Sequence, residues 1–238
     1  MEAQDRLAYV RIAGKSALAA ALCLGLPAGL LLWLILVQQF VHAAAVQQAI
    51  AFLQAHGLYS IYILVVSSIL WSYLLGRISG YRPWWWIMIA TAAGILAAWF
   101  SPLANVDGIL YSSWPDIPIH LNYAASMAGL VGGVTLFVGL AYGLILRSLK
   151  AALTMGLTTS LVSIVAILTT IFLFDQFGIR VGGAVPLAMS KVTVTGLLTS
   201  AITGGAILGV GFTKYHFTSN GRSWQQASAE EGKETGIH

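Results

Sequence analysis

The chain has 238 residues, of which 58% are hydrophobic and only 8% are charged. Its mean hydropathy of +0.82 excludes an ordinary soluble domain. The formal net charge of +4 does not indicate nucleic-acid binding, because the basic residues stand in short segments between apolar runs, where they act as topology signals.

The first apolar run follows Arg6, Arg11 and Lys15 and extends over residues 16–37. It precedes three alanines at 43–45, so the N-terminus imitates a signal peptide with its cleavage site. The apolar core of a signal peptide is usually about 7–15 residues long, and this run is longer. We therefore expect a retained first membrane helix.

Charge-free apolar runs of sufficient length predict an all-α integral membrane protein, since roughly 20 apolar residues cross a bilayer as a helix. The predicted spans form one domain over residues 1–215 and cover 16–38, 58–76, 83–100, 121–146, 151–174 and 185–213. Residues 42–57 are expected to form a surface helix or to extend the first span. The polar segment 216–238 is expected to be a mobile cytosolic tail.

Basic residues cluster on one predicted side of the membrane. With six crossings, this side carries Arg6, Arg11, Lys15, Arg77, Arg82, Arg147, Lys150, Lys214, Arg222 and Lys233. The opposite side carries Asp107, Asp116 and Asp175 and few positive charges. Because lysine and arginine favour the cytoplasmic side, we expect a protein of the cell membrane with both termini in the cytoplasm.

Small residues recur four apart in the fourth and sixth predicted spans, and this spacing puts them on one helix face. They are Gly129, Gly133, Gly139, Gly143, Gly196, Ser200 and Gly204. Small side chains let two helix backbones approach closely inside a membrane, so the pattern predicts tight packing of spans four to six. An alternative is that these glycines permit sliding or open a path.

Hydroxyl residues are frequent in the fifth span, and in the sixth they form a row with Thr195 and Thr199 one and two turns after Lys191. Such side chains can line a polar route for a ligand. They can equally hydrogen-bond the carbonyl four residues earlier in their own helix, which is always within reach.

Lys191 is the one charge in the apolar stretch of residues 186–212. The 22 uncharged residues that follow it, 192–213, span roughly 33 Å as a helix, close to the hydrocarbon thickness of a bilayer. We therefore interpret Lys191 as an anchor at the outer interface. The alternative is a deeper position paired with Asp175, which ends span five on the same side.

The outer loop contributes Asp107, Asp116 and His120 as further candidates for ligand contact. Their spacing does not match a complete calcium-binding loop, and we expect no metal site. Zinc-protease, serine-hydrolase and phosphate-loop motifs are absent from the sequence, and its single cysteine is Cys23. We therefore expect no cofactor and no enzymatic activity.

These features favour a permease-like or transporter subunit that moves a small solute and depends on a partner protein or an ion gradient. The length and topology are similar to those of small permease subunits, an analogy of fold alone. The alternative is a non-catalytic structural or assembly subunit of a larger membrane complex; a third is an integral membrane enzyme. Expected partners are the lipid bilayer and other membrane subunits or further copies of the chain, with no nucleic acid.

Overall fold

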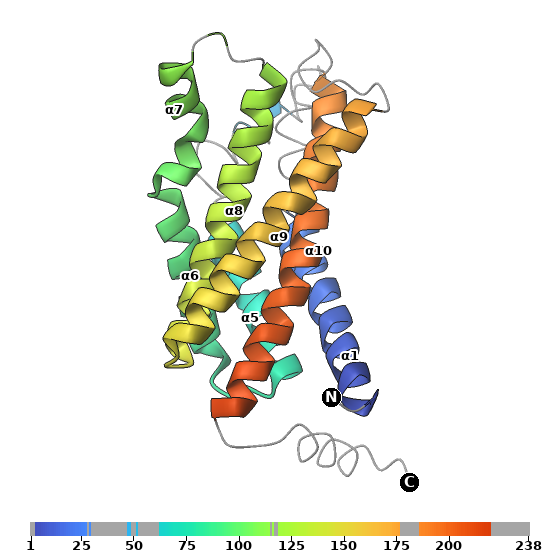
Figure 1. Ribbon diagram of the computed structural model, residues 1–238, viewed down its shortest axis with the longest axis vertical. Coiled ribbons are helices and arrows are strands. Elements are labelled where there is room, and N and C mark those ends of the chain that lie inside the picture. The colour runs from blue at the N-terminus through green and yellow to red at the C-terminus, as the bar shows by residue number, and fades with distance from the viewer. Residues whose placement is uncertain are drawn as a thin grey trace.

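A computed structural model of the chain describes residues 3–27, 29, 47–48, 51, 62–114, 116, 119–176 and 186–219. Within these residues the regular elements are helices, and none is a strand (Figure 1). The helices are α1 (Ala3–Ala20), the π-helix η1 (Ala21–Gly25), the π-helix η2 (Tyr62–Ser67), α5 (Ser68–Ser79), α6 (Trp84–Trp99), the 3-10 helix η3 (Pro102–Asn105), α7 (Val106–Ser113), α8 (Ile119–Ile145), α9 (Leu149–Gln176) and α10 (Pro186–Ser219).

Four helices are long and apolar enough to cross a membrane, and they indicate a membrane location. The four segments are Leu7–Gly25, Leu121–Ile145, Leu149–Phe174 and Val194–Thr218. Two shorter apolar helices, Val65–Ser79 and Trp84–Trp99, correspond to the second and third predicted spans. The chain is therefore a helical membrane protein in which each predicted span coincides with an apolar helix over at least part of its length.

Two helices have bounds that differ from the prediction. The first helix begins at Ala3, well before residue 16, because alanine, leucine, arginine and lysine favour helix and a membrane boundary does not end hydrogen bonding along the backbone. The last helix continues to Ser219, into the predicted tail. Parts of the predicted segments lie outside the described residues, among them residues 31–38 of the first span, 58–61 of the second span, and almost all of the surface helix expected at 42–57. Residues 220–238 of the predicted tail also lie outside them.

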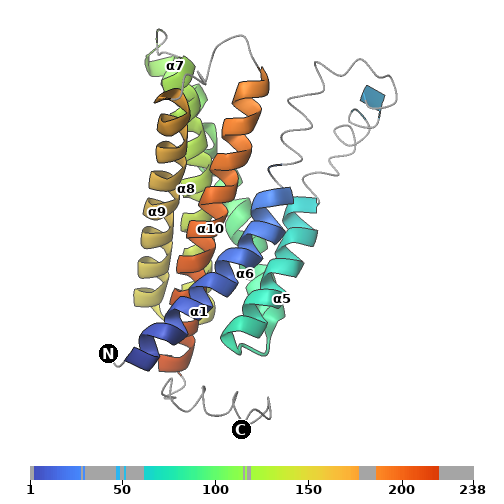
Figure 2. The ribbon, with the colours of Figure 1, turned by 90° about the vertical axis from the view of Figure 1, so that its right-hand side faces the viewer.

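Four chain segments meet at one end of the bundle, which we call the lower end: the start of α1, the α5–α6 turn at 80–83, the α8–α9 turn at 146–148 and the end of α10 (Figures 1 and 2). Gly80 ends α5 in the left-handed conformation, with φ of 68°, which glycine adopts without steric cost. The Ser148 hydroxyl accepts a 3.1 Å hydrogen bond from the backbone N–H of Ala151 and caps α9. These turns bring Arg82 and Arg147 to the same end.

The main core lies where α1, α5, α6, α8, α9 and α10 converge. Its fully buried side chains include Trp71, Leu75, Ile87, Tyr142 and Phe212. The Phe212 ring meets the Tyr142 ring edge-on, with centroids 5.5 Å apart. Aromatic packing therefore ties α8 to α10.

The exterior is more apolar than parts of the interior, as α9 illustrates. Its outer face exposes Leu157, Leu161 and Phe172 by 59%, 64% and 60%. Its inner face buries Thr159 and Ser163 completely. A solvent-exposed helix would show the reverse pattern, whereas a helix in lipid can present leucine outward and small or hydroxyl residues to its neighbours.

Candidate functional site

Helices α9 and α10 face each other through buried or partly buried hydroxyl residues, which we call the hydroxyl column: Thr159, Ser163 and Thr170 of α9, and Thr195, Thr199 and Ser200 of α10. The Thr170 and Thr199 hydroxyls are hydrogen-bonded at 3.1 Å. Lower down, the Ser200 hydroxyl donates to the backbone carbonyl of Ser163 at 3.3 Å. The column therefore connects two membrane helices through polar contacts.

The middle of the hydroxyl column has spare hydrogen-bonding capacity. The hydroxyls of Thr159 and Ser163 are fully buried and make no hydrogen bond within the described part of the chain. Ser163 Oγ faces Gly204, since a Cβ placed on this glycine would lie 2.8 Å from it. A buried hydroxyl without a partner carries a desolvation cost, and this cost would fall if a polar ligand reached it.

Several threonines also bond to their own helix. The hydroxyl of Thr199 donates to the carbonyl of Thr195 at 2.9 Å, and Thr170 donates to Ala166 at 2.8 Å. This is the local alternative that the sequence left open. Each hydroxyl has one hydrogen, so when Thr170 and Thr199 bond to each other, one of them donates across the helix contact and the other donates to its own helix.

The predicted packing residues lie at close helix contacts. A Cβ at Gly139 would be 2.7 Å from the backbone of Gly156, and Gly143 is packed against the backbone of Ala152. Gly129 and Gly133 face Leu103 of η3, and Gly196 faces Ile167. Ser200 and Gly204 both face Ser163. The small faces are therefore covered by other segments of the same chain.

The predicted charged candidates lie on several elements. Lys191 is in the first turns of α10 and Asp175 is near the end of α9, so their backbones belong to the end of the bundle opposite the lower end. Asp107 belongs to α7, His120 to α8, and Asp116 is exposed between them. The side chains of Lys191, Asp175, Asp107 and His120 lie outside the described part of the structure. Among the side chains that it does describe, no three His, Cys, Asp or Glu residues come together.

One buried polar network was missed in the sequence. The Trp71 indole N–H donates to the Tyr142 hydroxyl at 2.7 Å, and that hydroxyl is also hydrogen-bonded to the Thr91 hydroxyl at 2.7 Å. The Thr91 hydroxyl in turn donates to the carbonyl of Ile87. The available signal was a tryptophan and a tyrosine inside charge-free apolar runs, where their polar atoms require partners if they are buried.

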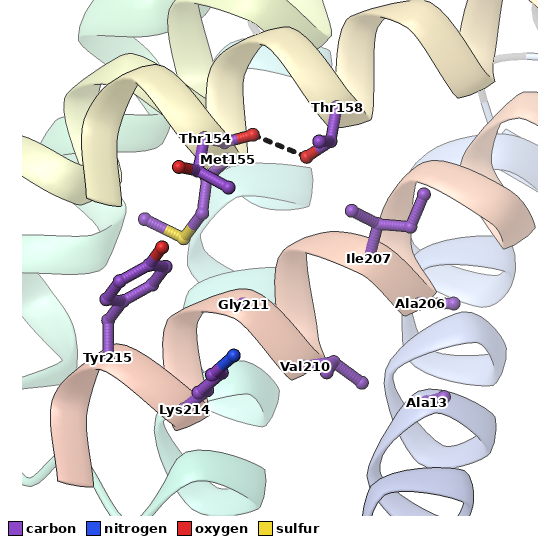
Figure 3. Close-up of a pocket in the computed structure, with 10 residues that line it drawn as sticks. All are labelled: Ala13, Thr154, Met155, Thr158, Ala206, Ile207, Val210, Gly211, Lys214 and Tyr215. Atoms are coloured by element: carbon purple, nitrogen blue, oxygen red, sulfur yellow. Dashed lines mark hydrogen bonds between the residues drawn. The ribbon is translucent and has the colours of Figure 1, made fainter. Parts of the chain in front are cut away.

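A groove of about 350 Å³ opens near the lower end between α1, α9 and α10. Figure 3 shows Thr154, Met155 and Thr158 of α9 opposite Val210 and Lys214 of α10. Lys214 is the one charged side chain among the described residues of its wall.

The nearby α5–α6 turn carries Tyr81, whose ring meets Phe212 and His216 edge-on. Burial raises the pKa of the Tyr81 phenol above its ordinary value, and the positive charge of Arg147 offsets part of that rise. Tyr81 is therefore a neutral packing group at physiological pH.

Comparison with known proteins identifies no relative: the chain matches no protein-family model, no curated protein and no solved structure.

Proposed function

We propose that this protein is a six-span permease subunit for a small polar solute, with both termini in the cytoplasm. It works with a partner protein or an ion gradient, and its role is not catalytic. The observation that carries the proposal is the hydroxyl column between α9 and α10, with two fully buried hydroxyls that lack a partner within the described chain. Such groups suit a transport route, because they can offer a solute hydrogen bonds in place of those that it loses on leaving water.

The extent of the hydroxyl column supports this proposal. Along α9 the column runs from Thr159 to Thr170, a rise of roughly 16 Å, which is about half of the hydrocarbon thickness. Hydroxyl groups without charge suit a neutral or weakly charged solute. Lys191, Asp175, Asp107, Asp116 and His120 belong, in this proposal, to the outer end of the route.

The gathering of four chain segments at the lower end supports the proposed topology. The exposed side chains of Arg77, Arg82, Arg147 and Lys150 belong to that end. An excess of lysine and arginine at one end of a helical bundle is typical of the cytoplasmic face. The shorter helices α5 and α6 then complete six crossings together with the four long ones.

The alternative role, a structural subunit, predicts small-residue faces that are open for neighbouring proteins to cover. Here Gly139, Gly143 and Gly204 instead contact the chain's own helices. Their use inside the bundle favours the permease proposal over the structural one.

Cysteine accessibility in native membranes tests the route. In a Cys23→Ala background, Ser163→Cys and Thr199→Cys should react with a small water-soluble thiol reagent, because a solute route admits water in at least one conformation. Val138→Cys is the dry control, since Val138 is buried in the apolar core. Ser112→Cys is the exposed control.

Resistance of both column cysteines, at the level of Val138→Cys, would overturn the route and leave a structural role. Purification of the full chain in mild detergent then tests the energy source. An accompanying ATPase or second membrane subunit is expected for a partner-driven permease. If the chain purifies alone and transports only when an ion gradient is present, the gradient is its energy source.

A further inference from the structure

The groove near the lower end has an apolar part and a charged part. Ala206, Ile207, Val210 and Gly211 of α10 form its floor, with Ala13 of α1 on one side and α9 on the other. Lys214 lies at its lower end, and Figure 3 shows the Tyr215 hydroxyl beside Met155. The groove therefore offers an apolar channel that ends at an ammonium group.

The groove lies near the end of the membrane-spanning part of α10, where one leaflet of a bilayer meets water. From Ile207 to Lys214 the α10 axis rises roughly 10 Å, and the helix continues only to Ser219. The helices that border the groove expose leucine side chains, such as Leu153 and Leu157 of α9. An occupant would thus contact lipid-facing helices along its length and the interfacial region at its charged end.

The lower end of α9 carries a second ammonium group, Lys150. Lys150 is four residues before Thr154 in α9, which puts the two on one face of the helix, one turn apart. Lys150 and Lys214 are both exposed, and the described residues that line the groove include no acidic side chain to neutralise them. The charged end of the groove is therefore complementary to an anion.

We propose that this groove binds one anionic phospholipid from the cytoplasmic leaflet. Its phosphate lies between Lys214 and Lys150, and one acyl chain lies along Ile207 and Val210. Basic pockets between membrane helices on the cytoplasmic side are suited to anionic headgroups, because each nearby lysine contributes about 1 kcal/mol to binding. The site is separate from the proposed solute route, and it does not require that the protein transports anything.

Native mass spectrometry of the full chain, delipidated in mild detergent and titrated with phosphatidylglycerol or phosphatidylcholine, tests the site. The parent protein should retain one phosphatidylglycerol in preference to phosphatidylcholine. Lys214→Gln should weaken phosphatidylglycerol binding about fivefold, the ratio that corresponds to one lysine contact. Lys150→Gln should weaken it in the same direction.

Arg82→Gln is the matched control, because it removes one exposed positive charge from the α5–α6 turn at the same end. It should leave binding unchanged. Val210→Phe keeps both lysines and fills the channel, so it should weaken phosphatidylglycerol and phosphatidylcholine alike. Thermal unfolding of each variant checks that it is folded.

The proposal is overturned if the two lipids bind equally, if Arg82→Gln weakens binding as much as Lys214→Gln, or if Val210→Phe leaves lipid binding intact. A dimer that is independent of phosphatidylglycerol and is lost in Val210→Phe would assign the groove to a second copy of the chain. Each of these results is separable from the cysteine test of the solute route, which uses residues outside the groove.

Discussion

Trp71 and Tyr142, 71 positions apart in the chain, meet in the core through a 2.7 Å hydrogen bond from the indole N–H to the phenol hydroxyl. Their exposed fractions are 1% and 0%, so water is not available to either polar atom. Thr91 bonds to the same hydroxyl. Three helices, α5, α6 and α8, are therefore joined at one oxygen atom.

Tyr142→Phe should lower the free energy of unfolding by about 1–2 kcal/mol, because it leaves the Trp71 N–H buried without its acceptor. Unfolding in a detergent and denaturant mixture measures this loss. Tyr73→Phe is the control, because Tyr73 is 45% exposed and its ring contact with Trp84 does not need the hydroxyl. Equal effects of the two substitutions would contradict a structural role for the buried bond.

Trp71→Phe combined with Tyr142→Phe should cost less than the sum of the two single substitutions. Once the donor and the acceptor are both absent, neither is left unsatisfied on account of the other. The double-mutant cycle isolates this coupling from the packing lost with the indole ring. Strict additivity would show that the bond itself contributes little.

Gly139→Ala should destabilise the bundle by about 1–3 kcal/mol, because the added Cβ would meet the backbone of Gly156 and force α8 and α9 apart. Gly14→Ala is a matched control: Gly14 is also helical, but a Cβ there meets nothing within 4 Å. The control should be neutral or slightly stabilising, since alanine favours helix. Melting temperatures that fall alike in both variants would contradict close approach as the cause.

Thiol labelling should place the two ends of the bundle on opposite sides of the membrane. In a Cys23→Ala background, Ser112→Cys should react from outside intact cells, and Arg82→Cys should react only after permeabilisation. Arg82 is a suitable probe because it is exposed in the α5–α6 turn. External labelling of Arg82→Cys would reverse the proposed topology.

Lys191→Arg should be harmless and Lys191→Gln mild, because an interfacial lysine needs water and phosphate and has no fixed partner. The unbroken α10 supports this expectation, since the uncharged interval from Lys191 to Lys214 is a continuous helix about as long as a bilayer is thick. Activity and stability of both variants provide the measurement. Strong coupling to Asp175→Asn in a double-mutant cycle would instead establish a buried pair.

The sequence by itself determined the helical membrane class and located the helices of the bundle. The length of an apolar run and the charges at its ends are local properties of the sequence, and they were sufficient to locate α8, α9 and α10. The start of α1 at Ala3 was not predicted, because hydropathy marks the membrane boundary, whereas helix propensity and hydrogen bonding decide where a helix begins.

Only the tertiary structure decided which side chains meet. The sequence marked Gly139 and Gly143 as packing residues, but their partners, Gly156 and Ala152, follow from the orientation of α8 against α9. The bond between Trp71 and Tyr142 and the groove between Ala13, Thr154 and Lys214 join residues far apart in the chain. Such contacts depend on the relative rotation of packed helices, which a one-dimensional pattern of apolar and small residues does not specify.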